Sequence, residues 1–368
     1  MSKIKNSFKF IGKVDFGNDF FRTIESLKNK KWHGKEISFS IKNETGSQFV
    51  KLFGGTTEGQ PIFTFSKDKD ETGKLIKLEI PLNKRFDKEV IDTVANFKKI
   101  KVLDNEFITE VDAIDYILEN KIDFDGKRVV VVGEVDFDLY KGKVYQKYYL
   151  TGIYEAKEDQ DDGFIGNMAM FFNEDALEET YKKGNGLNYS LIEKERKLPI
   201  TIYIEKYNKD KATRSEKPNF YIPIGVVLNI SDKFDFSNEK HMKRLGMLAE
   251  SFIVKKGVYE MGWEVRYHKG SEKTEITMND LTKFEKMQIE NGVKTFEEIV
   301  KGKQVWGEFT EEIQLIRFHS SYENGLEETP LTDEDLEVLF FEADLEGELD
   351  KVKPKSKVEE IDDDEDLF

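Results

Sequence analysis

Two short stretches of the chain place a lysine between two aromatic residues at alternating positions. The trios are Phe49, Lys51 and Phe53 in the first stretch and Tyr145, Lys147 and Tyr149 in the second. Successive side chains of a β-strand point to opposite faces, so each trio shares one face. In the first stretch Val50 and Leu52 point the other way and supply the core face, which leaves the trio outside. Exposed rings can stack on unpaired nucleobases while ammonium groups meet phosphates, so the pattern predicts a surface for single-stranded nucleic acid.

Further aromatic and basic residues flank the two trios. The additional candidate contacts are Lys30, Lys31 and Trp32 before the first trio and Tyr140, Lys141 and Lys143 before the second. A third platform is expected at Trp263 and Tyr267 with Arg266 between them, although Arg266 falls on the opposite face of an extended strand. The alternative is that these rings are covered by a helix or a neighbouring domain and belong to a core.

Residues suited to catalysis are sparse. The chain has no cysteine, and its four histidines, His33, His241, His268 and His319, are scattered without the spacing of metal ligands. Glu134, Asp136 and Asp138 alternate on one strand and could hold Mg²⁺ as in a metal-dependent nuclease. The plainer interpretation of these three acids is a solvated strand end that enters a turn. We therefore predict that the protein is not an enzyme and needs no cofactor or metal.

One pattern recurs along the chain. FIGKVDF at 10–16 and VVGEVDF at 131–137 share an apolar residue, a glycine, a charged residue and Val-Asp-Phe, and VWGEF at 305–309 is a weaker copy. A glycine inside a strand marks a bulge, a bend or a close backbone approach, as a small closed barrel requires. The separation of Gly12 and Gly133 approaches the size of one small β domain, so each copy is expected to begin a barrel.

The predicted fold is mainly β with a few helices and consists of two small barrels in tandem. The expected domains are 1–105, 106–235, a mixed α/β region at 236–320 that could form part of a third barrel, and an acidic, largely disordered tail at 321–368. Helical periodicity predicts helices over 87–98, 109–119 and 237–252. The chain has no apolar run long enough to span a membrane and no signal peptide at its start, which favours a cytoplasmic protein.

The net charge of −16 is concentrated at one end of the chain. Residues 321–368 hold 19 of the 73 acidic residues and 4 of the 57 lysines and arginines, so this segment carries −15 and the remainder −1. A nearly neutral body is compatible with a nucleic-acid partner. The chain closes on an acidic run followed by two apolar residues: Asp362, Asp363, Asp364, Glu365, Asp366, Leu367 and Phe368.

This ending resembles the C-terminal tip of the single-stranded DNA-binding proteins of bacteria and phages, in which an acidic run such as Asp-Asp-Asp-Ile-Pro closes on a phenylalanine. The resemblance implies an oligonucleotide-binding (OB) fold and a tip that recruits replication, recombination or repair proteins. The bacterial members have one such fold, a long linker and a tetrameric state. This chain has more than one candidate barrel and a short lysine-containing linker, which looks more like a phage-encoded version in the host cytoplasm or a fused-barrel type. We expect it to be monomeric without DNA.

The sequence therefore favours sequence-tolerant binding of single-stranded DNA, with protein partners held by the tip. Two alternatives stay open at this point. One is a β-rich phage structural or scaffold protein with an acidic docking tail, and the other is the Mg²⁺-dependent nuclease.

Overall fold

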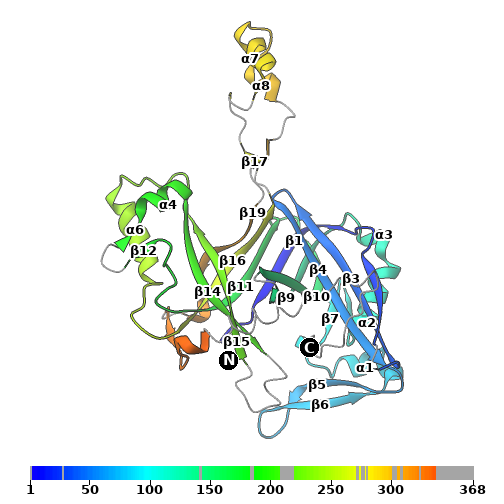
Figure 1. The fold of residues 1–368 in the computed structure, drawn as a ribbon. Helices are drawn as coiled ribbons and strands as arrows, with labels where there is room; N and C mark the ends of the chain where they lie inside the picture. The colour runs from blue at the N-terminus through cyan, green and yellow to red at the C-terminus, as the bar shows by residue number, and fades with distance from the viewer. Residues whose placement is uncertain are drawn as a thin grey trace, which may run out of the picture.

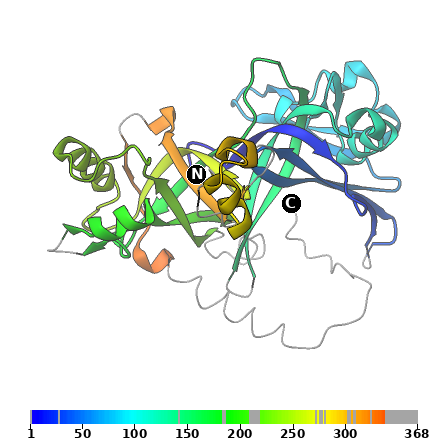
Figure 2. The same ribbon diagram turned by 90° about the horizontal axis from the view of Figure 1, so that it is seen from above.

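The computed structural model describes residues 2–26, 29–140, 143–182, 186–207, 219–270, 273–274, 278, 281–300, 305–306, 310–322 and 325–336. Most of its long strands join one 14-stranded sheet that curls into two barrels, which Figures 1 and 2 show side by side. The chain is thus mainly β with a few helices, as the sequence predicts.

The first barrel has five strands and spans residues 7–155. They are β1 (Ser7–Asp15), β3 (Trp32–Asn43), β4 (Gly46–Thr57), β9 (Arg128–Tyr140) and β10 (Lys143–Glu155). Strand β1 pairs with both β3 and β9, and β4 pairs in parallel with β10. The helix α2 (Glu110–Glu119) lies in the connection between β4 and β9. This closed connectivity is that of the OB fold.

The second barrel repeats this connectivity over residues 163–318. Its strands are β11 (Gly163–Phe172), β14 (Lys197–Tyr207), β15 (Asn219–Asn229), β16 (Tyr259–Gly270) and β19 (Thr310–Phe318). Strand β11 pairs with both β14 and β16, β15 pairs in parallel with β19, and α6 (Glu239–Glu250) lies between β15 and β16. Strands β16 and β19 of the region 236–320 therefore complete this second barrel, and the described residues of that region form no third one.

The two barrels join through their first strands. One edge of β1 pairs with β9, and the other pairs with β11 over Ser7–Ile11 and with β3 over Lys13–Asp15. Gly12 lies at this change of partner, where a side chain would collide with the carbonyl oxygen of Lys42. The close approach that the strand glycine predicts is therefore confirmed, and Gly133 shows a second one against Tyr149.

The repeated pattern has a different meaning from the expected one. FIGKVDF lies in β1 and VVGEVDF lies in β9, and these are neighbouring strands of one barrel, with Phe10 opposite Val131. The expected domain boundaries near residues 105 and 235 each fall inside a barrel. Pairing between distant strands leaves little local trace in sequence, so the recurrence alone could not distinguish two barrels from two strands of one.

The core is continuous across the junction of the barrels. Tyr267 of β16 packs against Phe10 and Tyr148 of the first barrel, with ring centroids 6.0 and 5.3 Å away, and its hydroxyl donates to the carbonyl of Ser7 at 3.2 Å. All three rings are buried. The barrels therefore share both main-chain pairing and side-chain packing.

Two of the three expected helices are present. In α2, Thr109 accepts a hydrogen bond from the amide of Asp112 at 3.2 Å, and Ile114 and Ile117 face the core. The helix expected over 237–252 is α6, which buries Leu245. The helix expected over 87–98 is wrong. Only α1 (Lys88–Ile91) and a 3-10 turn, η2 (Asn96–Lys98), form there, because the backbone of Val94 and Ala95 pairs with β5 instead.

Additional elements decorate the barrels. The first barrel carries β2 (Phe21–Glu25), β5 (Ile62–Lys69), β6 (Leu75–Ile80), η1 (Leu82–Lys84), β7 (Ile100–Val102), β8 (Asn105–Phe107) and α3 (Lys121–Phe124). The second carries β12 (Tyr181–Lys182), β13 (Gly186–Leu187), α4 (Tyr189–Glu195), β17 (Lys273–Thr274), α7 (Lys283–Glu290), α8 (Phe296–Val300), β18 (Val305–Trp306), η4 (Ser320–Tyr322) and β20 (Glu327–Glu328). Helices α7 and α8 form an arm that projects from the second barrel (Figure 1).

The start of the expected tail is ordered. Strand β20 pairs with β16, and Leu336 is buried against the second barrel. Residues 337–368, with the acidic tip, lie outside the described part of the chain.

Candidate nucleic-acid interface

The two lysine-centred trios lie on one face of the first barrel. Strands β4 and β10 are parallel neighbours, with Lys51 opposite Tyr149, and the Lys51 ammonium lies 4.9 Å from the centroid of the Tyr149 ring. Phe49 is 64% exposed and Tyr145 is 46% exposed, while Phe53 and Tyr149 are half-buried. Val50 and Leu52 point inward, as alternation requires. We call the outward face of β4 and β10 that carries the two trios the aromatic face.

Trp32 extends the aromatic face at the end of β4. Its ring lies 6.1 Å from that of Phe53, measured between centroids. The indole rests on Gly34 and Gly55, a cross-strand pair at which a side chain would overlap its ring atoms. Because the two glycines carry no side chains, the tryptophan ring can pack directly on the backbone there, and it remains half-buried.

The lysines of the aromatic face have acidic partners. Lys51 lies 3.8 Å from Glu36, which also pairs with Arg22 of β2 at 3.1 Å, and Lys147 pairs with Asp138. Burial, together with the charges of Lys147 and Arg22, lowers the pKa of Lys51, and Glu36 opposes that change. A phosphate would have to compete with these carboxylates for the two ammonium groups.

The acids considered as a metal site have ammonium partners. Glu134 pairs with Lys5 at 2.8 Å, Asp136 with Lys206 at 3.4 Å, and Asp138 with both Lys147 and Lys206. Although burial acts to raise the pKa of Asp138, hydrogen bonds from the two lysines hold it below its usual range. In the part of the chain that the structure describes, no group of three acidic or histidine side chains is placed to hold a metal ion.

The third platform expected at Trp263 and Tyr267 is wrong. Both side chains are buried, and Trp263 packs between Phe252 and Phe318 with ring centroids 5.8 and 4.2 Å away. They share the inward face of β16 with Val265, whereas Arg266 points outward and is exposed. The alternation of apolar and polar residues in this strand was the signal that could have placed both rings in the core.

The remaining candidates lie around the aromatic face to different extents. Lys30 and Lys31 are exposed just before Trp32, and Lys143 is exposed at the start of β10. Tyr140 ends β9, but its side chain is not among those described, and Lys141 lies outside the described residues. The sequence reasoning missed Arg22, which no motif marks and which reaches the site only because β2 pairs with β3.

Part of the outer surface of the second barrel is covered by a later segment of the chain. Tyr203 of β14 and Tyr221 of β15 pack with Phe171 against Leu331 and Leu336 of the segment that follows β20. Tyr221 is buried as a result. At the strand pair that corresponds to Lys51 and Tyr149, the second barrel instead places Val227 of β15 opposite Gln314 of β19.

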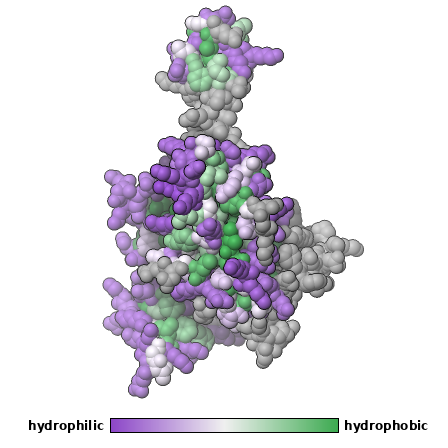
Figure 3. Space-filling view, turned by 90° about the vertical axis from the view of Figure 1, so that its left-hand side faces the viewer, coloured by the Kyte–Doolittle hydropathy of each residue, from purple (hydrophilic) through white to green (hydrophobic). Residues whose placement is uncertain are grey.

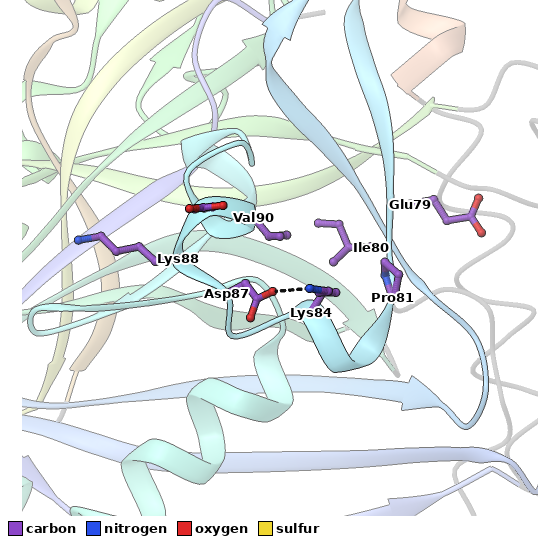
Figure 4. Close-up of a pocket in the computed structure, with 8 residues that line it drawn as sticks. Glu79, Ile80, Pro81, Lys84, Asp87, Lys88 and Val90 are labelled. Carbon is purple, nitrogen blue, oxygen red and sulfur yellow. Dashed lines mark ion pairs between the residues drawn. The ribbon is translucent and has the colours of Figure 1, made fainter.

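Two other surface features differ in character from the aromatic face. A cleft of about 650 Å³ is lined by Ile80, Pro81 and Val90 and by charged residues that include the ion pair of Lys84 and Asp87 at 3.1 Å (Figure 4). It has no aromatic lining on which a base could stack.

The arm of α7 and α8 shows apolar side chains among polar ones (Figure 3). Phe284 of α7 is 62% exposed.

The chain was compared with protein-family models, curated proteins and solved structures. No protein-family model matches the chain, and no curated protein matches it. Among solved structures, a deletion mutant of the single-stranded DNA-binding protein from Thermus aquaticus has a TM-score of 0.27 and 6% sequence identity. That match covers 85% of this chain and 93% of the other. No helix among the described residues has the length and apolarity to cross a membrane.

Proposed function

We propose that this protein binds single-stranded DNA with little sequence preference through the aromatic face of its first barrel. The proposal rests on the position of the two trios side by side on one face, where Lys51 lies next to Tyr149. The rings of Phe49 and Tyr145 are exposed there. Every base has a π-face, so stacking on such rings tolerates any sequence, and one OB barrel covers about 4–16 nucleotides. The role is one of binding, without catalysis, in DNA replication, recombination or repair.

The acidic tip is the proposed contact for other proteins. The acidic run and the ring of Phe368 suit an apolar pocket rimmed by lysine or arginine on a replication or recombination protein. The covalent joining of two barrels in one chain supports a monomeric state without DNA. Deleting residues 359–368 should abolish capture of such a partner and leave binding to single strands intact or tighter.

A binding assay with matched oligonucleotides tests the main proposal. Fluorescence anisotropy should report much tighter binding of a labelled dT oligomer of roughly 16 nucleotides than of a duplex of the same length. Binding should quench tryptophan emission, and Trp32→Phe should reduce that quenching, because Trp32 lies on the aromatic face whereas Trp263 is buried and Trp306 belongs to β18 of the second barrel. Equal affinity for duplex and single strand would refute stacking as the basis of binding. Mg²⁺-dependent cleavage of the oligomer would instead support the nuclease.

A further inference from the structure

Beside Trp32, a cleft of about 370 Å³ opens between the end of β4 and the hairpin of β5 and β6. Its lining includes Trp32, Thr56, Gln60, Phe63, Lys98 and Glu110. This volume falls in the range of small-molecule sites and exceeds what one nucleobase occupies. The cleft adjoins the aromatic face, because Trp32 belongs to both.

Aromatic side chains line the cleft on two separate elements. Trp32 comes from β3 and Phe63 from β5, and Phe63 is 72% exposed although it belongs to the β5–β6 hairpin. Exposing a phenyl ring to this extent forgoes the free energy of its burial. A flat ligand that stacks in the cleft would cover these rings.

The cleft also contains a carboxylate held in a fixed position. Glu110 begins α2, and its side chain lies against Gly54 and accepts a hydrogen bond from its own amide. The start of the helix is anchored by Asp112, which accepts from Thr109 at 2.7 Å and from Arg85 at 3.0 Å. Among the described residues, no ion pair within 4 Å engages Glu110, and its burial raises its pKa while Lys98 acts to lower it.

We propose that this cleft takes one guanine of a bound single strand, stacked on Trp32 and read by the Glu110 carboxylate through its Watson–Crick edge. An ionised carboxylate offers only acceptors. Guanine is the DNA base whose Watson–Crick edge offers two adjacent donors, the N1–H and the N2 amino group, to match its two oxygens. Thymine offers a single N–H between two carbonyls that repel the carboxylate. Lys98, exposed at the cleft, meets the adjoining phosphate.

The inference rests on the proposed function and adds a preference at one position of the strand. Reading unstacked bases on their Watson–Crick edges is how proteins recognise single strands by sequence. The rings of the aromatic face remain indifferent to base identity. The protein would therefore coat any strand but favour placements that put a guanine in the cleft.

The experiment compares a dT oligomer with the same oligomer carrying one interior guanine. Wild-type protein should bind the guanine oligomer roughly tenfold more tightly in an anisotropy competition, as expected for one two-point contact. Glu110→Gln should lose this preference, because a carboxamide replaces one acceptor by a donor. Glu119→Gln, at the exposed far end of the same helix, should keep it.

A ligand change gives a second readout with the unmodified protein. Replacing the guanine by hypoxanthine removes the N2 amino group, and most of the preference should disappear. Equal binding of both oligomers by wild type, with binding to dT intact, would overturn the guanine site and leave the proposed function standing. An undiminished preference in a folded Glu110→Gln protein would also overturn it. Absence of any oligomer binding would refute the proposed function itself.

Discussion

Removing the phenyl ring of Phe49 should weaken the binding of single strands and leave the fold intact. Phe49 projects from β4 with 64% of its surface exposed, so it is the most accessible ring of the aromatic face. Stacking of one base on an aromatic side chain is worth about 1–3 kcal/mol by alanine substitution. At about 1.4 kcal/mol per factor of ten, Phe49→Ala should raise the Kd for a dT oligomer roughly 5- to 140-fold.

The cost to stability should be small because the ring is mostly exposed. Burying a whole phenylalanine side chain contributes about 1.5–3 kcal/mol, and Phe49 buries roughly a third of that surface, which gives about 0.5–1 kcal/mol. For a barrel of this size such a change lowers Tm by less than about 4 °C. Affinity and stability should therefore separate clearly in this variant.

The assay is a titration of labelled dT oligomer at fixed salt, paired with a thermal melt. Phe86→Ala is the matched control, since Phe86 is 59% exposed but contacts Arg85 away from the aromatic face. The control should bind as wild type does. If Phe49→Ala binds within twofold of wild type, or if it melts much earlier, the ring does not serve as a stacking platform.

Two further predictions concern the same face. Because burial lowers the pKa of Lys51, this lysine loses its proton at a lower pH than an ordinary one, so affinity should fall as pH rises toward the usual lysine range. Lys51→Arg should keep its affinity over the same pH range. The measurement uses a dA oligomer, because thymine itself loses a proton in that range. Identical affinity–pH profiles for the two proteins would show that Lys51 does not contact the strand. Gly55→Ala should displace the Trp32 indole, which shifts tryptophan emission and weakens binding. Gly225→Ala, with open space around it, should do neither, and an unchanged spectrum for Gly55→Ala would show that Trp32 lies elsewhere.

Local alternation placed the side chains of the aromatic face correctly where the core side of a strand was evident. In β4 the inward residues Val50 and Leu52 fix the outward position of Phe49 and Phe53. The same reasoning applied to β16 puts Trp263 inside, since Met261 and Val265 share its face of the strand while Glu264 and Arg266 lie on the opposite face. In this strand, burial of the large ring outweighs the presence of a charged residue nearby.

What the sequence could not reveal is which strands pair. The two trios were expected in separate barrels, yet β4 and β10 are parallel neighbours that bring Lys51 beside Tyr149. Such a contact joins residues far apart in the chain and depends on closure of the whole barrel. The cleft beside Trp32 is hidden for the same reason, because α2 and the β5–β6 hairpin meet β4 only in the folded chain. The acidic tip remains a prediction.

Main-chain pairing between β1 and β11 joins the two barrels directly, without a linker between the paired strands. Proteins that connect such domains by flexible linkers can change the length of nucleic acid that they cover. In the proposed complex the second barrel therefore keeps one position relative to the aromatic face, and the length of single strand that each molecule protects should not change with salt or protein density.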